Sequence, residues 1–164
     1  MDELTLSTPR LLLPMITADD VAAIVDGPRL PGWADDFPAE GDRDIAGFLA
    51  RTGIPSGPDA LFGPRLVVER DSGLAVGSVG FHGPPENGRV EIGYGLVESR
   101  WGRGYATEAV RTTVRFALDH PRVSEVVATL EVGNAASVRV LEKIGFRFRS
   151  RTGTEDLYAL PADS

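Results

Sequence analysis

The stretch that decides the fold reads ESRWGRGYATEA, from residue 98 to residue 109. It joins a segment of strand character, residues 89–97, to the longest run with helical periodicity, residues 105–120. Small residues at positions 102, 104 and 106 let a ligand approach the backbone closely. The first amides of a helix have no acceptor within the helix, and the helix dipole favours an anion there. With Arg100 and Arg103 close by, this turn predicts a pyrophosphate site.

Three other interpretations of this turn are a turn without a ligand, a P-loop and a dinucleotide-binding turn. A glycine-rich turn without a ligand stays open on this stretch alone. A phosphate-binding P-loop requires G-x-x-x-x-G-K-[ST], which the chain does not contain. Gly102 and Gly104 begin a dinucleotide fingerprint, but Thr107 stands where the third glycine belongs. Too little chain follows for the rest of a parallel doubly wound sheet, so a dinucleotide-binding oxidoreductase fails on topology.

Upstream of the turn, residues 65–70, 74–81 and 89–97 alternate as strands, with turn sequences at 71–73 and 86–88. They predict an antiparallel meander. Nearer the N-terminus, residues 4–6 and 10–13 predict a first strand, and Thr17 caps a short helix through Val25. We expect a second short helix, capped by Asp42 or Asp44, between irregular segments at 26–41 and 53–64.

Downstream, the helical pattern that starts at Tyr105 stops at Pro121. Residues 126–132 are rich in β-branched side chains and predict a strand, and a helix from Asn134 or Ala135 ends before Gly145. Residues 146–151 and 156–160 close the chain as strands. This order predicts an α+β fold: a single domain over residues 1–164 with a mixed, mostly antiparallel sheet flanked by helices.

Composition narrows the function classes. The chain of 164 residues has a net charge of −7, which argues against a general nucleic-acid binder. It has no cysteine, which excludes disulfides, Cys-ligated zinc and a cysteine nucleophile. With His82 and His120 as the only histidines, we expect no metal. The N-terminus has no apolar signal region and no run reaches the length of a membrane span, so we expect a cytoplasmic protein that does not bind membranes.

Residues 101–109, WGRGYATEA, resemble the acetyl-CoA motif of the GNAT N-acetyltransferases, whose general form is R/Q-x-x-G-x-G/A. The particular residues of this motif are similar to those of the branch containing the ribosomal-protein N-terminal acetyltransferases. STPRLLL at 7–13, EIGY at 91–94 and NAASVRVLEKIGF at 134–146 extend the resemblance, which covers about residues 4–15 and 65–150. Trp101 replaces the Arg or Gln of the general motif, and Pro14 replaces a frequent basic residue. Residues 26–64 match nothing that identifies an acceptor.

The resemblance implies acetyl-CoA as cosubstrate and a primary amine as acceptor, either a small molecule or a protein N-terminus. Without a cysteine an acyl-Cys intermediate is impossible, which favours direct transfer. Dimers are common among relatives, so a homodimer stays open. In relatives two strands splay apart, and backbone N–H groups there would hold the oxyanion. The residues expected at the cofactor are Leu96, Val97, Arg100, Trp101, Gly102, Arg103, Gly104, Tyr105, Ala106, Thr107 and Asn134.

Two residues are predicted to be catalytic. Period two puts Glu91 on one strand face with Gly93, Gly95 and Val97, and the matching position in relatives is often an acid that accepts the proton. The alternative is a solvated or salt-bridged strand glutamate. Ser137 matches a family position that donates a hydrogen bond to the leaving sulfur. The alternative is that Asn134 and Ser137 serve the start of their helix as a cap.

The acceptor site is harder to predict. Trp33, Asp36 and Phe37 lie in the Pro-rich segment and could line an acceptor pocket, with aromatic rings and negative charge facing a cation. Aromatic residues in such a loop could equally anchor it to the core. For the whole protein, the competing hypothesis is a catalytically silent CoA-binding regulatory module of the same fold.

Overall fold

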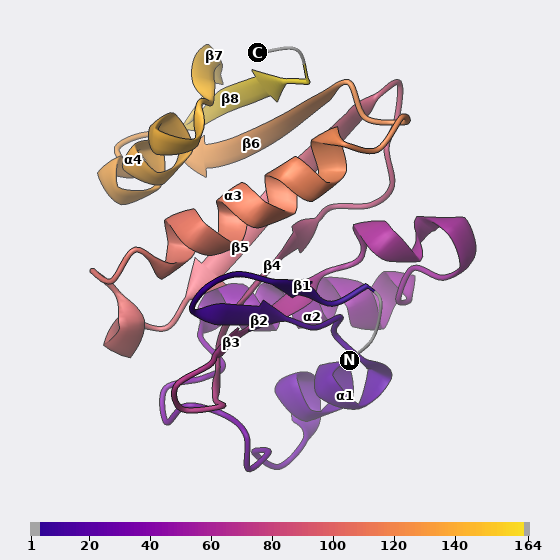
Figure 1. Ribbon diagram of the computed structural model, residues 1–164, viewed down its shortest axis with the longest axis vertical. Helices are drawn as coiled ribbons and strands as arrows, with labels where there is room; N and C mark the ends of the chain where they lie inside the picture. Colours follow the sequence, from indigo (N-terminus) through magenta and orange to yellow (C-terminus); the bar gives the residue numbers. More distant parts are fainter. Residues whose placement is uncertain (1–3, 163–164) are drawn as a thin grey trace.

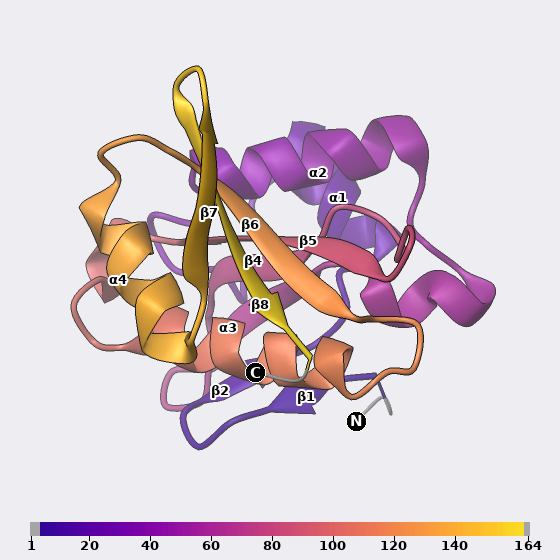
Figure 2. The same cartoon turned by 90° about the horizontal axis from the view of Figure 1, so that it is seen from above.

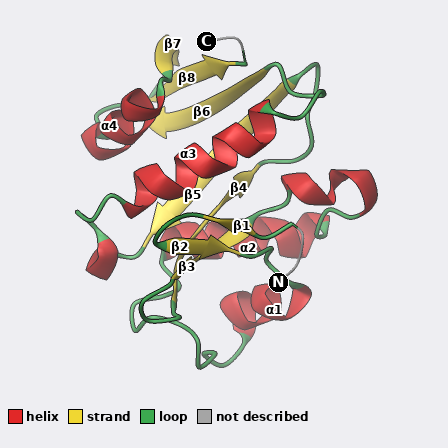
Figure 3. Cartoon of the chain, viewed as in Figure 1, coloured by secondary structure: helices red, strands yellow, loops and turns green. Residues whose placement is uncertain are grey.

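A computed structural model describes residues 4–162 (Figures 1 and 3). They form an eight-stranded sheet in the order β1-β2-β3-β4-β5-β6-β8-β7. The strands are β1 (Leu6–Ser7), β2 (Leu11–Leu13), β3 (Arg65–Glu69), β4 (Ala75–Phe81), β5 (Arg89–Leu96), β6 (Glu125–Glu131), β7 (Arg147–Thr152) and β8 (Glu155–Pro161). The α-helices are α1 (Ala18–Asp26), α2 (Glu40–Thr52), α3 (Tyr105–Leu118) and α4 (Ala135–Ile144), and short 3₁₀ turns are η1 (Gly57–Phe62) and η2 (Glu98–Arg100).

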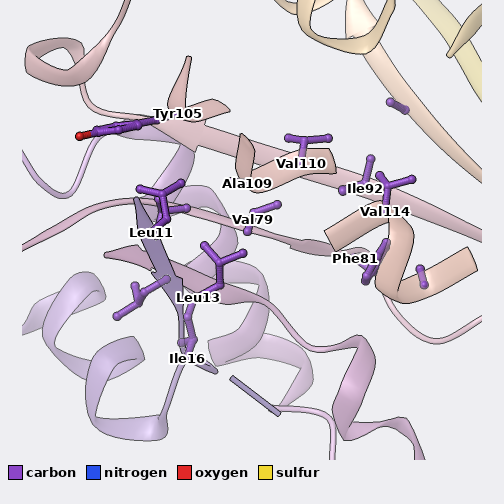
Figure 4. Packing of buried hydrophobic residues seen from close by; sticks show 14 of the residues in the cluster. Leu11, Leu13, Ile16, Val79, Phe81, Ile92, Tyr105, Ala109, Val110 and Val114 are labelled. Atoms are coloured by element: carbon purple, nitrogen blue, oxygen red, sulfur yellow. The ribbon is translucent and has the colours of Figure 1, made fainter. Parts of the chain in front are cut away.

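The helices cover both faces of the sheet. Figure 2 shows α1 and α2 on one side, and α3 and α4 on the other. The apolar stripe of α3, including Ala109, Val110 and Val114, packs on side chains of β2, β4 and β5 (Figure 4). Because α3 is held on this face over its whole length, its N-terminus is fixed beside the end of β5.

One strand pair breaks the antiparallel pattern. β5 and β6 run parallel, as α3 connects them, and they pair only over Arg89–Glu91 with Glu125–Val127. Past this point the two strands run apart toward the loops that lead into α3 and α4 (Figure 1). The prediction of an α+β fold with a mixed, mostly antiparallel sheet is confirmed.

Most boundaries agree with expectation to within two residues, and three larger differences are found near the N-terminal half of the sheet. The predicted first strand is two short strands, because a turn closes after Thr8, whose N–H donates to the Leu11 carbonyl at 2.9 Å. α2 begins at Glu40, ahead of both predicted caps. The segment 53–64, expected to be irregular, contains η1.

Asp42 ties α2 to the sheet. Its side chain is buried, and it accepts hydrogen bonds from the Ser78 hydroxyl on β4 at 2.6 Å and from the Ala39 N–H at 2.8 Å. The second bond satisfies an amide at the start of α2, so one carboxylate both caps the helix and anchors it. Burial raises the pKa of Asp42, although the hydrogen bond from Ser78 opposes this shift.

We expect Asp42→Ala to lower the free energy of unfolding by about 2–3 kcal/mol, because it leaves a buried hydroxyl and a helix amide without acceptors. Urea unfolding measures the change. Asp44→Ala is the matched control, since Asp44 lies exposed on the same helix, and it should stay within about 0.5 kcal/mol of wild type. Equal stability of the two variants would contradict an anchoring role for Asp42.

Candidate functional site

The turn before α3 has the geometry expected of an anion site. Gly102 and Gly104 both adopt positive φ, +77° and +81°, which a side chain would strain. The first backbone bond of α3 runs from the Glu108 N–H to the Gly104 carbonyl at 3.1 Å. The amides of Tyr105, Ala106 and Thr107 therefore precede the first helical hydrogen bond and point out of the N-terminus. Gly102 is open, because a Cβ there would meet nothing within 4 Å.

A buried carboxylate holds this turn in place. Glu69, at the end of β3, accepts a hydrogen bond from the Tyr105 hydroxyl at 2.7 Å and from Arg100 Nε at 3.1 Å. Arg103 Nη1 lies 3.4 Å from the same carboxylate. Burial acts to raise the pKa of Glu69, but the hydrogen bonds from Ser72, Tyr105 and Arg100 outweigh it and the pKa is lowered. Glu69 is thus charged at neutral pH and joins both ends of the turn to the sheet.

This arrangement revises the role of the arginines. The Arg100 side chain is only 17% exposed and faces Glu69, so its charge is compensated inside the protein. Arg103 is 52% exposed and keeps the weaker of the two contacts, which leaves it free to turn toward an anion. Arg10 binds the turn from the other side: it donates to the Arg103 carbonyl at 2.7 Å and stacks 4.7 Å from the centre of the buried Tyr105 ring.

Asp36 and Trp101 also shape the turn. Asp36 accepts hydrogen bonds from both the N–H and the hydroxyl of Ser99 at 2.9 Å, and the first of these lowers the pKa of Asp36. It therefore caps η2. Trp101 is 63% exposed, and its Nε1–H donates to the Leu96 carbonyl at 2.8 Å. The indole covers the end of β5.

The edge of β5 that faces β6 carries unpaired amides. The Glu91 carbonyl accepts a hydrogen bond from the His82 N–H at 2.9 Å, and the Val97 N–H donates to the Val76 carbonyl in β4, also at 2.9 Å. Because backbone groups alternate sides along an antiparallel strand, the amides of Tyr94 and Leu96 point toward β6 instead. Pairing with β6 has ended by then. The expectation of an available N–H is wrong for Val97, because that N–H is hydrogen-bonded within the sheet. The N–H of Leu96 lies on the open edge.

The start of α4 faces this edge. The Asn134 side chain accepts the Ser137 N–H at 3.2 Å and caps the helix. The bond uses the backbone of Ser137, so its hydroxyl has no part in the cap. Tyr94 reaches the same place from β5: its hydroxyl is buried and has no hydrogen-bond partner among the described residues. Burial raises the pKa of Tyr94, and the neighbouring Ser137 side chain offsets part of the shift.

On the opposite face of β5, Glu91 pairs with a histidine. Its Oε2 lies 3.3 Å from Nδ1 of His82, the residue that follows β4. The hydrogen bond from His82 lowers the pKa of Glu91, and it outweighs burial, which acts in the opposite direction. Of the two glycines that follow Glu91 on this face, Gly93 has its side-chain position filled by a neighbour and Gly95 has room for a Cβ. A Cβ on Gly93 would lie 2.7 Å from His82 Nε2, and one on Gly95 would lie 4.0 Å from the Cα of Gly41 in α2.

A hollow of about 340 Å³ opens between α2 and β4 next to this pair. Ile45, Phe48 and Phe81 give it an apolar wall, while Asp44 and His82 are polar. A second, more polar hollow of about 620 Å³ lies on the other side of His82 and includes Glu91 and Arg89.

Two of the three predicted acceptor residues are buried in the core. Trp33 and Phe37 are 7% and 0% exposed, and their rings pack edge to face with centroids 5.2 Å apart. They anchor the segment to the core, as the alternative had it. Asp36 caps η2. The hollow that borders the His82–Glu91 pair lies elsewhere, on the side of α2.

Sequence reasoning missed Glu69, Tyr94 and His82 as parts of the site. His82 had no usable signal either, because the Glu86–Arg89 bridge at the turn would place Pro84 opposite Glu91, and the register shifts by two residues before Phe81 pairs with Ile92. Glu69 and Tyr94 act across the fold, so no local pattern identifies them. Within residues 4–162 no cluster of three or more potential ligands could hold a metal ion, and no helix there is long and apolar enough to cross a membrane.

We expect Glu69→Gln to weaken acetyl-CoA binding about tenfold, because the neutral amide no longer holds both arginines and the turn loses its fixed shape. Isothermal titration measures the dissociation constant. Glu98→Gln is the control, since Glu98 is an exposed acid in η2, and its affinity should match wild type. Unchanged affinity of Glu69→Gln would show that the turn is ordered without this carboxylate.

Comparisons with known proteins agree with this geometry. A family profile described as "Acetyltransferase (GNAT) domain" matches residues 10–147. The uncharacterized N-acetyltransferase YjdG of Bacillus subtilis (strain 168) is 38% identical over 86 residues, 52% of this chain and 51% of the relative. The chain thus spans about half the length of the curated relatives it matches.

Solved structures show the same fold. A GNAT-family acetyltransferase from Bacillus anthracis has a TM-score of 0.69 at 21% identity, covering 98% of this chain and 99% of that one. RimL, a ribosomal L7/L12 alpha-N-protein acetyltransferase solved in complex with coenzyme A, has a TM-score of 0.62 at 16% identity, covering 94% and 95%. These structures show the shared fold, and the profile that matches residues 10–147 establishes that this chain belongs to the GNAT acetyltransferase family.

Proposed function

We propose that the protein transfers an acetyl group from acetyl-CoA directly to a primary amine, either of a small molecule or of a protein N-terminus. One observation carries this proposal: β5 separates from β6 directly beside the N-terminus of α3. An unpaired strand edge and a cluster of free helix amides thus adjoin each other. The strand edge suits the extended, amide-bearing pantetheine arm of acetyl-CoA, and the helix amides suit its pyrophosphate.

The residues present fit such a ligand. The amides of Tyr105, Ala106 and Thr107 would hold the pyrophosphate, with Arg103 as the mobile cation. Gly102 leaves its approach open. The edge amides of Tyr94 and Leu96 would pair with the arm, and one of them would stabilise the oxyanion that forms at the acetyl carbonyl.

Proton transfer divides between the two faces of β5. An alkyl ammonium loses two protons as it becomes an amide: one leaves through the His82–Glu91 pair to solvent, and the other ends on the coenzyme A sulfur. The hydroxyls of Ser137 and Tyr94 lie on the face toward α4, where they would donate hydrogen bonds to the developing thiolate. Because burial raises the pKa of Tyr94, it acts as a neutral donor.

Acetyl-CoA at about one hundred times its dissociation constant should raise the melting temperature by roughly 5–10 °C, since binding then adds ~2.7 kcal/mol. NAD shares the adenosine and pyrophosphate but lacks the arm, and should give a much smaller shift. Release of coenzyme A is then followed with a panel of peptides, alkyl diamines and aminoglycosides. A shift without release for any amine would favour the silent CoA-binding module.

Ser137→Ala and Tyr94→Phe should each lower kcat about tenfold and change KM for acetyl-CoA less than about threefold, because each removes a donor to the thiolate. Neither should alter the cap of α4, which depends on the Asn134 side chain. Asn134→Ala is the contrasting variant and should cost about 1 kcal/mol of stability. Unchanged kcat in both hydroxyl variants would mean that the sulfur leaves without them.

A further inference from the structure

Family resemblance points to Glu91 as the group that takes the proton from the amine, but its surroundings do not suit that task. One oxygen of the carboxylate already accepts from His82, 3.3 Å away. This contact, with a smaller contribution from the Thr129 side chain, lowers the pKa of Glu91. A carboxylate stabilised in this way is a poor acceptor for the proton of an alkyl ammonium at neutral pH.

His82 stands in the better position. Its Nδ1 faces Glu91, so the carboxylate selects the form of the ring that carries a proton on Nδ1 and leaves the lone pair on Nε2. Nε2 lies over β5, at the place a side chain on residue 93 would fill: a Cβ there would be 2.7 Å away. Gly93 does not adopt positive φ, so the ring, and not the backbone, explains the glycine.

The surroundings of His82 allow access. Its side chain is 49% exposed and borders both the apolar hollow beside α2 and the polar hollow beyond Glu91. Charge near the ring is mostly negative, which favours a cationic ammonium, and Arg89 is compensated by Glu125 at 2.8 Å. The titratable groups that share these hollows with His82 are Asp44 from α2, Glu86 from the β4–β5 connection, Arg89 and Glu91 from β5, and Glu125 from β6.

We infer that Nε2 of His82 is the proton acceptor for the amine, and that Glu91 is a positioning residue that orients the ring and stabilises its cation. This inference rests on the proposed acetyl transfer to an amine. The ammonium N–H bond breaks as the Nε2–H bond forms, and the freed amine attacks the acetyl carbonyl. The C–N bond forms and the C–S bond breaks, the second amine proton passes to the departing coenzyme A sulfur, and His82 later returns its proton to solvent through the polar hollow.

Activity variants separate the two roles. On an alkyl amine, which is almost wholly protonated at pH 7, His82→Gln should lower kcat/KM about 10²-fold, and Glu91→Gln only about tenfold because the ring remains. The deficit of His82→Gln should shrink as the pH rises toward ~10, where the amine arrives neutral. On an aryl amine or a hydrazide, both neutral at pH 7, His82→Gln should stay within about threefold of wild type.

Gly93→Ala tests the position of the ring without removing either group. Its Cβ would displace Nε2, so it should copy the loss of His82→Gln on the alkyl amine and spare the weakly basic acceptor. Retained melting-temperature shifts with acetyl-CoA show that each variant is folded and binds its cosubstrate.

The form of the ring can be measured without any acceptor. In two-bond ¹H–¹⁵N spectra at about pH 8.5, where a reference imidazole is neutral, His82 should carry its proton on Nδ1. His120, the only other histidine, is an internal reference of the opposite form, because its Nδ1 accepts the Arg122 N–H at 3.1 Å. His82→Gln assigns the signals, and Glu91→Gln should move the His82 proton toward Nε2.

The outcomes are distinguishable. If wild type is active and His82→Gln matches it while Glu91→Gln loses about 10²-fold, Glu91 is the base and the inference is overturned although the proposed function stands. A wild-type His82 that carries its proton on Nε2 also overturns the inference. If wild type releases no coenzyme A with any amine, the proposed function fails, and the inference fails with it.

Discussion

The separation of β5 from β6 is the constraint on which the rest of the site depends. β5 and β6 are parallel strands joined by a helix, and they form a paired ladder over only three residues of β5, Arg89–Glu91. Beyond these the edge of β5 keeps its amides unpaired. Such an edge is usually a liability, and proteins cover it. In this fold the exposed edge adjoins the N-terminus of α3, so two sets of backbone donors meet in one place.

Backbone donors alone do not make a precise site, because the turn between β5 and α3 has no regular structure beyond the three residues of η2. Glu69 supplies the missing order. One carboxylate receives the Tyr105 hydroxyl, Arg100 and Arg103, and Arg10 binds the turn from the opposite side. Two of the arginines near the turn thus serve to shape it. The positive charge available to a ligand is smaller than the local composition indicates, and the helix amides carry correspondingly more of the expected binding.

The two faces of β5 carry different kinds of side chain. The face toward α4 collects neutral hydroxyls, Ser137 and Tyr94, beside the edge that would hold the thioester. The face toward α2 collects ionisable groups, His82 and Glu91, beside hollows open to solvent. A single strand can separate the hydroxyls from the ionisable groups because successive side chains point to opposite faces. The proposed donors to the leaving sulfur and the proposed acceptor of the ammonium proton therefore lie on opposite faces of the strand.

Local pattern in the sequence determined most of the elements: the glycine turn and the helix stripe predicted α3, and alternation predicted the meander of β3, β4 and β5. It also predicted an anion site at Gly102, Gly104 and the first turn of α3, since the expected chemistry lies within a few consecutive residues. Tertiary structure decided what the side chains do. Trp33 and Phe37 became core, Val97 lost its free amide to β4, and Arg100 turned inward to a carboxylate 31 positions away along the chain. His82 met Glu91 through strand pairing, and Tyr94 met Ser137 across the edge between β5 and α4. The physical reason is the same in each case: burial, hydrogen bonding and charge depend on neighbours in space, and sequence periodicity reports only the neighbours along one element.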